Sequence, residues 1–349
     1  MTFVKPSKCI TMKYIPIIIF VLFAQILFAQ EQLGLRLENY SGINSVLLNP
    51  TGNLTNPLQW DVNIASAAFF VENNYVFIEN TNTFDLLSNA SESEFYAVPD
   101  LETQVPPNAY IVDFFNDDKK RFGISQIDIM GPSFAYRIGE QHSIGLFTRA
   151  RMMASTQGLP NELSYYPYNS RAFLENFQLG PLGMAAMSWS ELGLNYAFKT
   201  PTNSGAFGIG INARLLTGYE AAFFQHTGTV QYAKNTQNSA IVQGVFAEFG
   251  YTSSNLVANS NDVELQKNGK GFAFDIGLLN IIGGEADDYT FKIGLSLLDV
   301  GFINFNENAS SHLVQTDSTK LLGGNAYDQF IGLEELDGIA QLFSTQALD

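Results

Sequence analysis

Cysteine is almost absent from this sequence, and the position of the one that is present excludes thiol chemistry. Cys9 is the only cysteine, and it precedes the apolar run Tyr14–Phe28. A lipid-bearing cysteine has to follow such a run, so Cys9 is not the anchor of a lipoprotein. We therefore expect neither disulfides nor thiol chemistry in the mature chain.

Apolar runs long enough to span a membrane as a helix are also missing. Tyr14–Phe28 contains fifteen residues, fewer than the roughly 20 that a spanning helix needs. Lysines precede it and Leu27-Phe28-Ala29 offers a cleavage point, so residues 1–29 predict a secretory signal peptide rather than a membrane anchor. No later segment has eighteen uninterrupted apolar residues, which predicts a mature chain without a helical span.

Charged side chains are scarce, and basic ones scarcer still. They make up 15% of the chain, against about 25% in soluble domains. Without residues 1–29, 15 Lys and Arg stand against 34 Asp and Glu, a net charge of −19. This balance argues against nucleic acid as a partner.

The few histidines give catalysis little support. His142, His226 and His312 have no Ser or Asp at a recognisable nucleophile motif, and we expect them in solvent-exposed loops. The acidic stretch 259–264 lacks the spacing and the turn glycine of a calcium loop. The sequence therefore predicts no enzyme, no catalytic residue, no cofactor and no metal site.

What the sequence has is alternation, most clearly from Ser190 to Leu216. Apolar residues alternate with small or polar ones on both sides of the turn residues 200–205. A period of two predicts strands with one apolar face, and the short turn between them predicts a β-hairpin. The residues of the apolar face are Leu192, Leu194, Tyr196, Phe198, Phe207, Ile209, Ile211, Ala213 and Leu215.

Similar alternation elsewhere predicts about ten to twelve strands. Low charge spread over many short alternating strands favours an all-β fold, a transmembrane antiparallel β-barrel of the outer-membrane type with lipid outside. We expect a first hairpin from 61–71 and 75–79, a second hairpin from 222–232 and 240–251, and loops over 80–108, 161–181 and 302–322. Short and long connections alternate from Gly139 onward, which predicts short periplasmic turns and long external loops.

The predicted organisation has four parts. Residues 1–29 are the signal peptide, and 30–60 form an N-terminal periplasmic or plug segment with a turn at Asn49-Pro50. Residues 61–304 hold the barrel strands, and 305–349 hold a loop and a short amphipathic helix within 327–343. Because no amphipathic strand closes the sequence, we expect the chain to continue beyond it.

Several local motifs together resemble a known family. They are Tyr40-Ser41-Gly42-Ile43, Leu48-Asn49-Pro50-Thr51, Gly131-Pro132-Ser133-Phe134, Thr148-Arg149-Ala150-Arg151, Leu192-Gly193-Leu194-Asn195-Tyr196-Ala197 and Leu216-Thr217-Gly218-Tyr219. They look like an uncharacterised Bacteroidetes-type outer-membrane β-barrel family, some members of which carry a C-terminal OmpA-like domain. Asn49-Pro50 is also distantly similar to the early motif of FadL-like transporters of hydrophobic compounds.

Charged residues on the face opposite the apolar one are candidates for a barrel lumen. Arg137, Arg149 and Arg151 share that face of one predicted hairpin. They are either members of an ion-pair network that holds strand register or an anion-attracting constriction. The further candidates are Glu191, Arg214, Asp275 and Lys292.

Two functions fit the predicted barrel in the outer membrane of a Gram-negative bacterium. The first is a porin-like channel or transporter for small compounds, hydrophobic ones included. The second is a structural or assembly component of the envelope, whose long loops bind partner proteins; peptidoglycan enters only through a further OmpA-like domain. The alternative is a secreted soluble β-sandwich adhesin or an outer-membrane hydrolase.

Overall fold

The computed structural model describes residues 36–37, 40–79, 81, 95–97, 110–115, 117, 119–161, 176–236, 239–252, 266–284, 289–316 and 320–323. The predicted signal peptide, the acidic stretch 259–264 and the predicted helix at 327–343 lie outside these residues. The fold is all-β and antiparallel apart from one short parallel pair. In the described part of the chain, no helix is long and apolar enough to cross a membrane.

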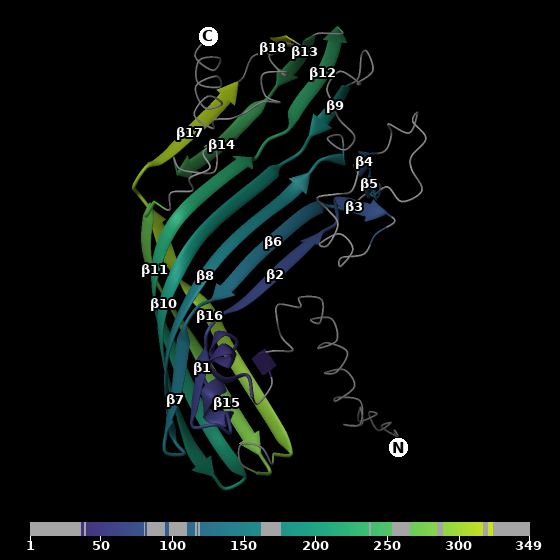
Figure 1. The fold of residues 1–349 in the computed structure, drawn as a ribbon. Coiled ribbons are helices and arrows are strands. Elements are labelled where there is room, and N and C mark those ends of the chain that lie inside the picture. The colour runs from purple at the N-terminus through teal and green to yellow at the C-terminus, as the bar shows by residue number, and fades with distance from the viewer. Residues whose placement is uncertain are drawn as a thin grey trace, which may run out of the picture.

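One large sheet dominates the molecule (Figure 1). Its strands are β1 (Trp60–Asn63), β2 (Ser66–Asn73), β6 (Arg121–Met130), β7 (Ser133–Ile138), β8 (His142–Leu159), β10 (Leu182–Thr202), β11 (Gly205–His226), β14 (Val245–Thr252), β15 (Gly269–Ile282), β16 (Phe291–Phe305) and β17 (Ala309–Thr316). One small sheet holds β9 (Asn176–Leu179), β12 (Val230–Thr236), β13 (Ser239–Gln243) and β18 (Lys320–Gly323). The other holds β3 (Val76–Glu79), β4 (Phe95–Ala97) and β5 (Tyr110–Phe114).

The large sheet contains seven rows, because several strands lie end to end in one row. β6 and β7 both pair with β8, and β2 and β1 pair with these two in turn. Likewise β14 and β15 both pair with β11, and β17 and β16 follow them. The sheet order is therefore β1–β2, β6–β7, β8, β10, β11, β14–β15 and β16–β17.

The rows form an up-and-down meander in chain order. The connections 139–141, 203–204 and 283–290 lie at one end of the sheet, which we call the short-turn end. The strands of the longer connections, β3, β4, β5, β9, β12 and β13, lie at the other end, the long-loop end, where they form the two small sheets together with β18. The predicted alternation of short and long connections is therefore present.

The central hairpin is confirmed and is longer than predicted. β10 and β11 pair from Leu182–His226 to Thr202–Gly205, and Leu192 faces Leu215 across the pair. Both strands continue through the predicted turn, so only residues 203–204 connect them. The predicted second hairpin is also present, since Ala222 pairs with Tyr251 and β12 pairs with β13.

The predicted first hairpin is wrong. Residues 61–71 form β1 and β2, which pair with β7 and β6, whereas β3 pairs with β5. Pro132 lacks a donor and breaks the neighbouring row between β6 and β7. The edge row breaks beside it, so Val62 and Ile64 point outward whereas Ala68 and Phe70 point inward. A slip of one residue along a strand moves every following side chain to the other face.

The large sheet has eleven strands, within the predicted ten to twelve, but segments read as loops also contain strands. β4, β9 and β17 fall within 80–108, 161–181 and 302–322. Each pairs with a strand that is distant in sequence or lies outside the expected ladder, namely β5, β12 and β14. Pairing with such partners overrides a polar local pattern, because strand formation depends on neighbours more than on propensity.

The two faces of the sheet differ in chemistry. Toward the short-turn end, the outer face exposes large apolar side chains, and Leu194, Leu215 and Leu295 are 62%, 62% and 68% exposed. The inner face packs against two 3-10 helices, η1 (Gly42–Leu47) and η2 (Gly52–Thr55). The core at this contact contains Ile43, Val46, Leu47, Met130, Ala135 and Phe147.

Candidate functional site

Residues 42–56, which we call the plug, lie inside the curve of the sheet. They come from the segment predicted as a periplasmic or plug segment, and Figure 1 shows the purple helices beside β1, β7 and β15. Asn212 Nδ2 donates to Val46 O over 2.8 Å, and Asn195 Nδ2 donates to Pro50 O over 2.8 Å. Both asparagines are buried, so hydrogen bonds from β10 and β11 fix the plug to the wall.

The predicted turn motif attaches the plug to two further rows. Asn49 Oδ1 accepts from the N–H and the hydroxyl of Thr51 over 3.0 and 2.7 Å. Asn49 Nδ2 donates to Leu278 O on β15 over 3.1 Å and to Leu295 O on β16 over 3.4 Å. The motif thus closes its own turn with one side-chain atom and contacts the wall with the other.

Inward glycines make room for this motif. A Cβ atom on Gly210 would lie 2.6 Å from Pro50 C, and one on Gly277 would lie 2.1 Å from Asn49 Oδ1. In the structure, the plug occupies the space that faces Gly210.

Beside the plug, four arginines and four carboxylates form an ion-pair network that is buried except for the half-exposed side chain of Asp299. Arg149 donates from Nε to Asp128 Oδ1 over 2.7 Å, and Arg36 Nη2 donates to Asp128 Oδ2 over 2.7 Å. Arg149 also lies 3.8 Å from Glu191. The members are Arg36, Arg149, Arg151, Arg214, Asp128, Glu191, Asp275 and Asp299.

Arg214 is the centre of this network. Its side chain is 2% exposed and contacts three carboxylates: Glu191 at 3.1 Å, Asp275 at 2.5 Å and Asp299 at 2.7 Å. Arg151 contacts Asp299 at 3.0 Å and lies over the Trp189 ring. Because Arg151 is on β8 and Asp299 on β16, the sheet is rolled far enough for the third and seventh rows to meet.

Two of the predicted lumen charges lie apart from this network. Arg137 donates to Asn56 O over 2.6 Å and to Pro57 O over 3.3 Å. Lys292 Nζ donates to Thr55 Oγ1 over 2.9 Å. Both therefore bind the end of the plug, while Arg149, Arg151, Glu191, Arg214 and Asp275 meet in the network.

Sequence reasoning missed Arg36, Asp128 and Asp299. Asp128 alternates with Ile127 and Ile129, a signal that was available in the sequence. Asp299 has a positive φ of 57° at an irregularity of β16, and this shift of register turns it inward. No period-of-two count would have placed it.

The histidines are not in exposed loops as predicted. His226 ends β11, is buried, and its Nδ1 lies 2.8 Å from Phe246 O. His312 lies in β17 and stacks on Phe249, with ring centroids 4.9 Å apart. His142 begins β8 and contacts Tyr196 OH at 3.0 Å. Within the described ranges, no group of three or more His, Cys, Asp or Glu could hold a metal ion.

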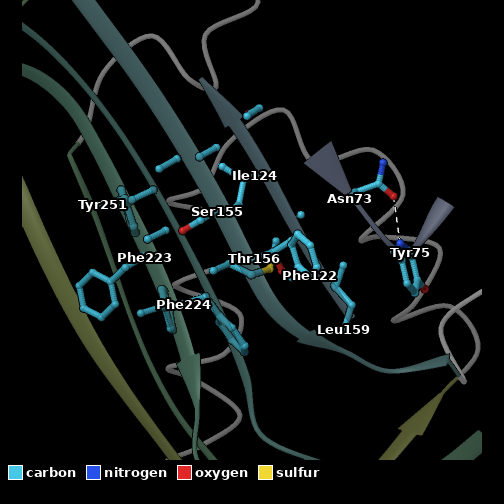
Figure 2. A pocket seen from close by; sticks show the side chains of 18 of the residues that line it. Asn73, Tyr75, Phe122, Ile124, Ser155, Thr156, Leu159, Phe223, Phe224 and Tyr251 are labelled. Carbon is cyan, nitrogen blue, oxygen red and sulfur yellow. Dashed lines mark hydrogen bonds between the residues drawn. The ribbon is translucent and has the colours of Figure 1, made fainter. Parts of the chain in front are cut away.

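A second candidate site is an apolar pocket of about 830 Å³ toward the long-loop end. Figure 2 shows side chains from β2, β6, β8, β11 and β14 around it. On β14 it is lined by Val245, Ala247, Phe249 and Tyr251 together with Gly250, which has no side chain, and Phe246 and Glu248 are absent from the lining. Since alternate residues share a face, the side chains of β14 place the pocket on one face of the sheet.

That face is the continuation of the exposed apolar one. Along β8, Ala150 and Met152 are exposed, and Ala154 and Thr156, which follow at the same alternation, line the pocket. Thr156 is the register partner of Met184 on β10, which also lines it. The pocket and the plug therefore lie on opposite faces of the sheet.

The network predicts that Glu191→Gln destabilises the fold strongly. Removing one charge from a buried pair costs about 3–5 kcal/mol, because its partners stay buried. The matched control is Glu307→Gln, whose exposed pair with Lys270 at 3.8 Å contributes less than about 1 kcal/mol. Urea unfolding in detergent, followed by tryptophan fluorescence, measures both. Equal stability of the two variants would contradict the network.

The plug contact predicts that Gly210→Val loosens residues 42–56. The added side chain meets backbone atoms of Pro50, which cannot rotate away, and such overpacking costs about 1–3 kcal/mol. We expect faster proteolytic cleavage within the plug than in the wild type, read by mass spectrometry. Gly183→Val is the control, since a Cβ there meets nothing within 4 Å. The same cleavage rate in both variants would contradict a packed plug.

Comparison with known proteins gives one match. The model of a family of unknown function, DUF5723, matches residues 54–346. No curated protein and no solved structure matches the chain. The matched range includes only the last three residues of the plug, 54–56, and all eighteen strands of the described part of the chain. The chain therefore belongs to the DUF5723 family of unknown function.

Proposed function

We propose that this chain forms the wall of an outer-membrane β-barrel in a Gram-negative bacterium, exported by residues 1–29. The observation that carries the proposal is the apolar outer face. On β10 and β11 alone it exposes Leu192, Leu194, Tyr196, Phe207, Ile209, Ile211 and Leu215. Monomeric soluble proteins rarely expose contiguous apolar patches larger than a few hundred Å².

The inner face supports the same proposal. A β-sandwich buries its apolar face against a second sheet, whereas here the buried side of the wall carries paired charges and the plug. Apolar side chains outside and polar ones inside are typical of transmembrane barrels. Among the described residues, no second sheet pairs or packs on the apolar face, which argues against a soluble β-sandwich adhesin.

We further propose that this barrel binds small apolar compounds, and we prefer this function to a purely structural one. The pocket supports this role, because a concave apolar site of 300–1,000 Å³ is typical of small-molecule binding. It lies on the lipid-facing side, beyond the exposed apolar belt, where a compound arriving at the membrane surface would meet it. A structural role is the second candidate. The plug and the ion-pair network support it, because they close the interior of the described wall.

The proposed lipid contact predicts that Ile211→Arg is poorly tolerated. Arginine on the lipid face near the midplane costs about 2–4 kcal/mol, falling to about 0–1 near the interface. Ser204→Arg, in the exposed two-residue turn, is the matched control. Recovery from the outer-membrane fraction and urea unfolding in lipid vesicles measure the effect. Equal tolerance at the two positions would contradict a membrane wall.

The proposed ligand site predicts that Ala154→Phe blocks binding of an apolar probe. A phenyl ring at this position fills space that Ala154 leaves open in the pocket. We expect N-phenyl-1-naphthylamine to bind at least about tenfold more weakly, a loss of about 1.4 kcal/mol, in a fluorescence titration. Ala150→Phe is the control, on the same face of β8 but outside the pocket. Unchanged affinity in Ala154→Phe would remove the pocket as the site.

A further inference from the structure

The large sheet has two edges that lack partners within the described part of the chain. The row β1–β2 pairs only with β7 and β6, and β16–β17 pairs only with β15 and β14. β16 alone presents fifteen residues of edge. Unpaired backbone groups of this kind are not tolerated in the hydrocarbon of a membrane, where each must find a hydrogen bond. Some polypeptide therefore completes both edges.

The directions of the rows restrict what that polypeptide is. Each neighbouring pair of rows is antiparallel, so direction alternates across the seven rows. The first row, β1–β2, and the seventh, β16–β17, both run from the short-turn end to the long-loop end. Joining them directly would create a parallel pair, which no neighbouring rows of this wall form.

A second copy of the chain does not solve the problem. A two-fold axis along the membrane normal leaves the direction of every row unchanged. Either edge of the copy would then run the same way as the edge it met, and the joint would again be parallel. Bacterial single-chain barrels are antiparallel with an even number of strands, and seven rows need an odd number more.

We propose that an odd number of further strands from the same polypeptide, C-terminal to β18, closes the wall between β16–β17 and β1–β2. The inference rests on the proposed membrane barrel. Two observations choose the C-terminal side. Successive rows of the chain are neighbours throughout the sheet, so the next row belongs beside β16–β17. The chain before β1 is the plug, which already lies inside the wall.

Photo-crosslinking in the full-length protein, in its native membrane, tests this directly. The probe p-benzoylphenylalanine replaces Leu295 or Phe302, which lie on the outer face of β16, and mass spectrometry identifies the captured residues. We expect both probes to capture residues C-terminal to Gly323 of the same chain. Because the partner runs in the opposite direction, the residue captured from position 302 should have the lower number. A probe at Phe207, which pairs with Thr200 and Asn280, is the positive control.

Each other outcome overturns the proposal. Capture of β1 or β2 would mean direct closure, and a product of twice the mass would mean pairing with a second copy. A higher captured number from position 302 would mean a parallel neighbour, and no captured protein with a working control would mean an open edge. Failure of the membrane proposal gives a different result, since Ile211→Arg would then be tolerated whichever residues the probes captured.

Discussion

The structure depends on pairing the guanidinium of Arg214, which is 2% exposed. Isolated charges are too costly to bury, so an interior arginine has to meet carboxylates with good geometry. Its three partners come from β10, β15 and β16, and Arg151 on β8 shares two of them. One set of contacts therefore fixes how the rows from β8 to β16 roll around the interior. Four carboxylates balance the four arginines, and one of them, Asp299, is half-exposed.

The position of the plug and the shape of the inner face of the wall depend on each other. Gly210 on β11 and Gly277 on β15 leave space that the Asn49-Pro50 turn occupies. Asn195 and Asn212 then bind the plug carbonyls, while Asn212 also donates to Asp275 of the network over 2.8 Å. Asn212 thus links the plug to the ion-pair network. The described interior is one connected polar assembly.

From the sequence we could predict the features that follow from a period of two within one strand, and little else. It identified the β10–β11 hairpin, its outward face, and Arg149, Arg151, Glu191, Arg214 and Asp275 as inward charges, because each follows from alternation within one strand. Asp299 lies beyond a bulge that changes the alternation, and Phe70 lies beyond a break that local pattern does not mark. The partners of β1, β2 and β17 follow from contacts between distant segments, which one sequence does not display. The contacts of Asn49 with β15 and β16 depend on the same missing information.

Strand length explains why the outer face of the wall carries both exposed apolar side chains and a pocket. β11 has 22 residues, about 75 Å at ~3.4 Å per residue, and at a tilt of about 45° it rises over 50 Å, roughly twice the height of an apolar band. The exposed apolar side chains of its outer face extend from Phe207 to Leu215. The pocket begins at Ala222, past the irregularity in pairing near Gly218. β8, β10 and β11 continue beyond these exposed side chains, and their additional length builds the pocket on the same face of the sheet.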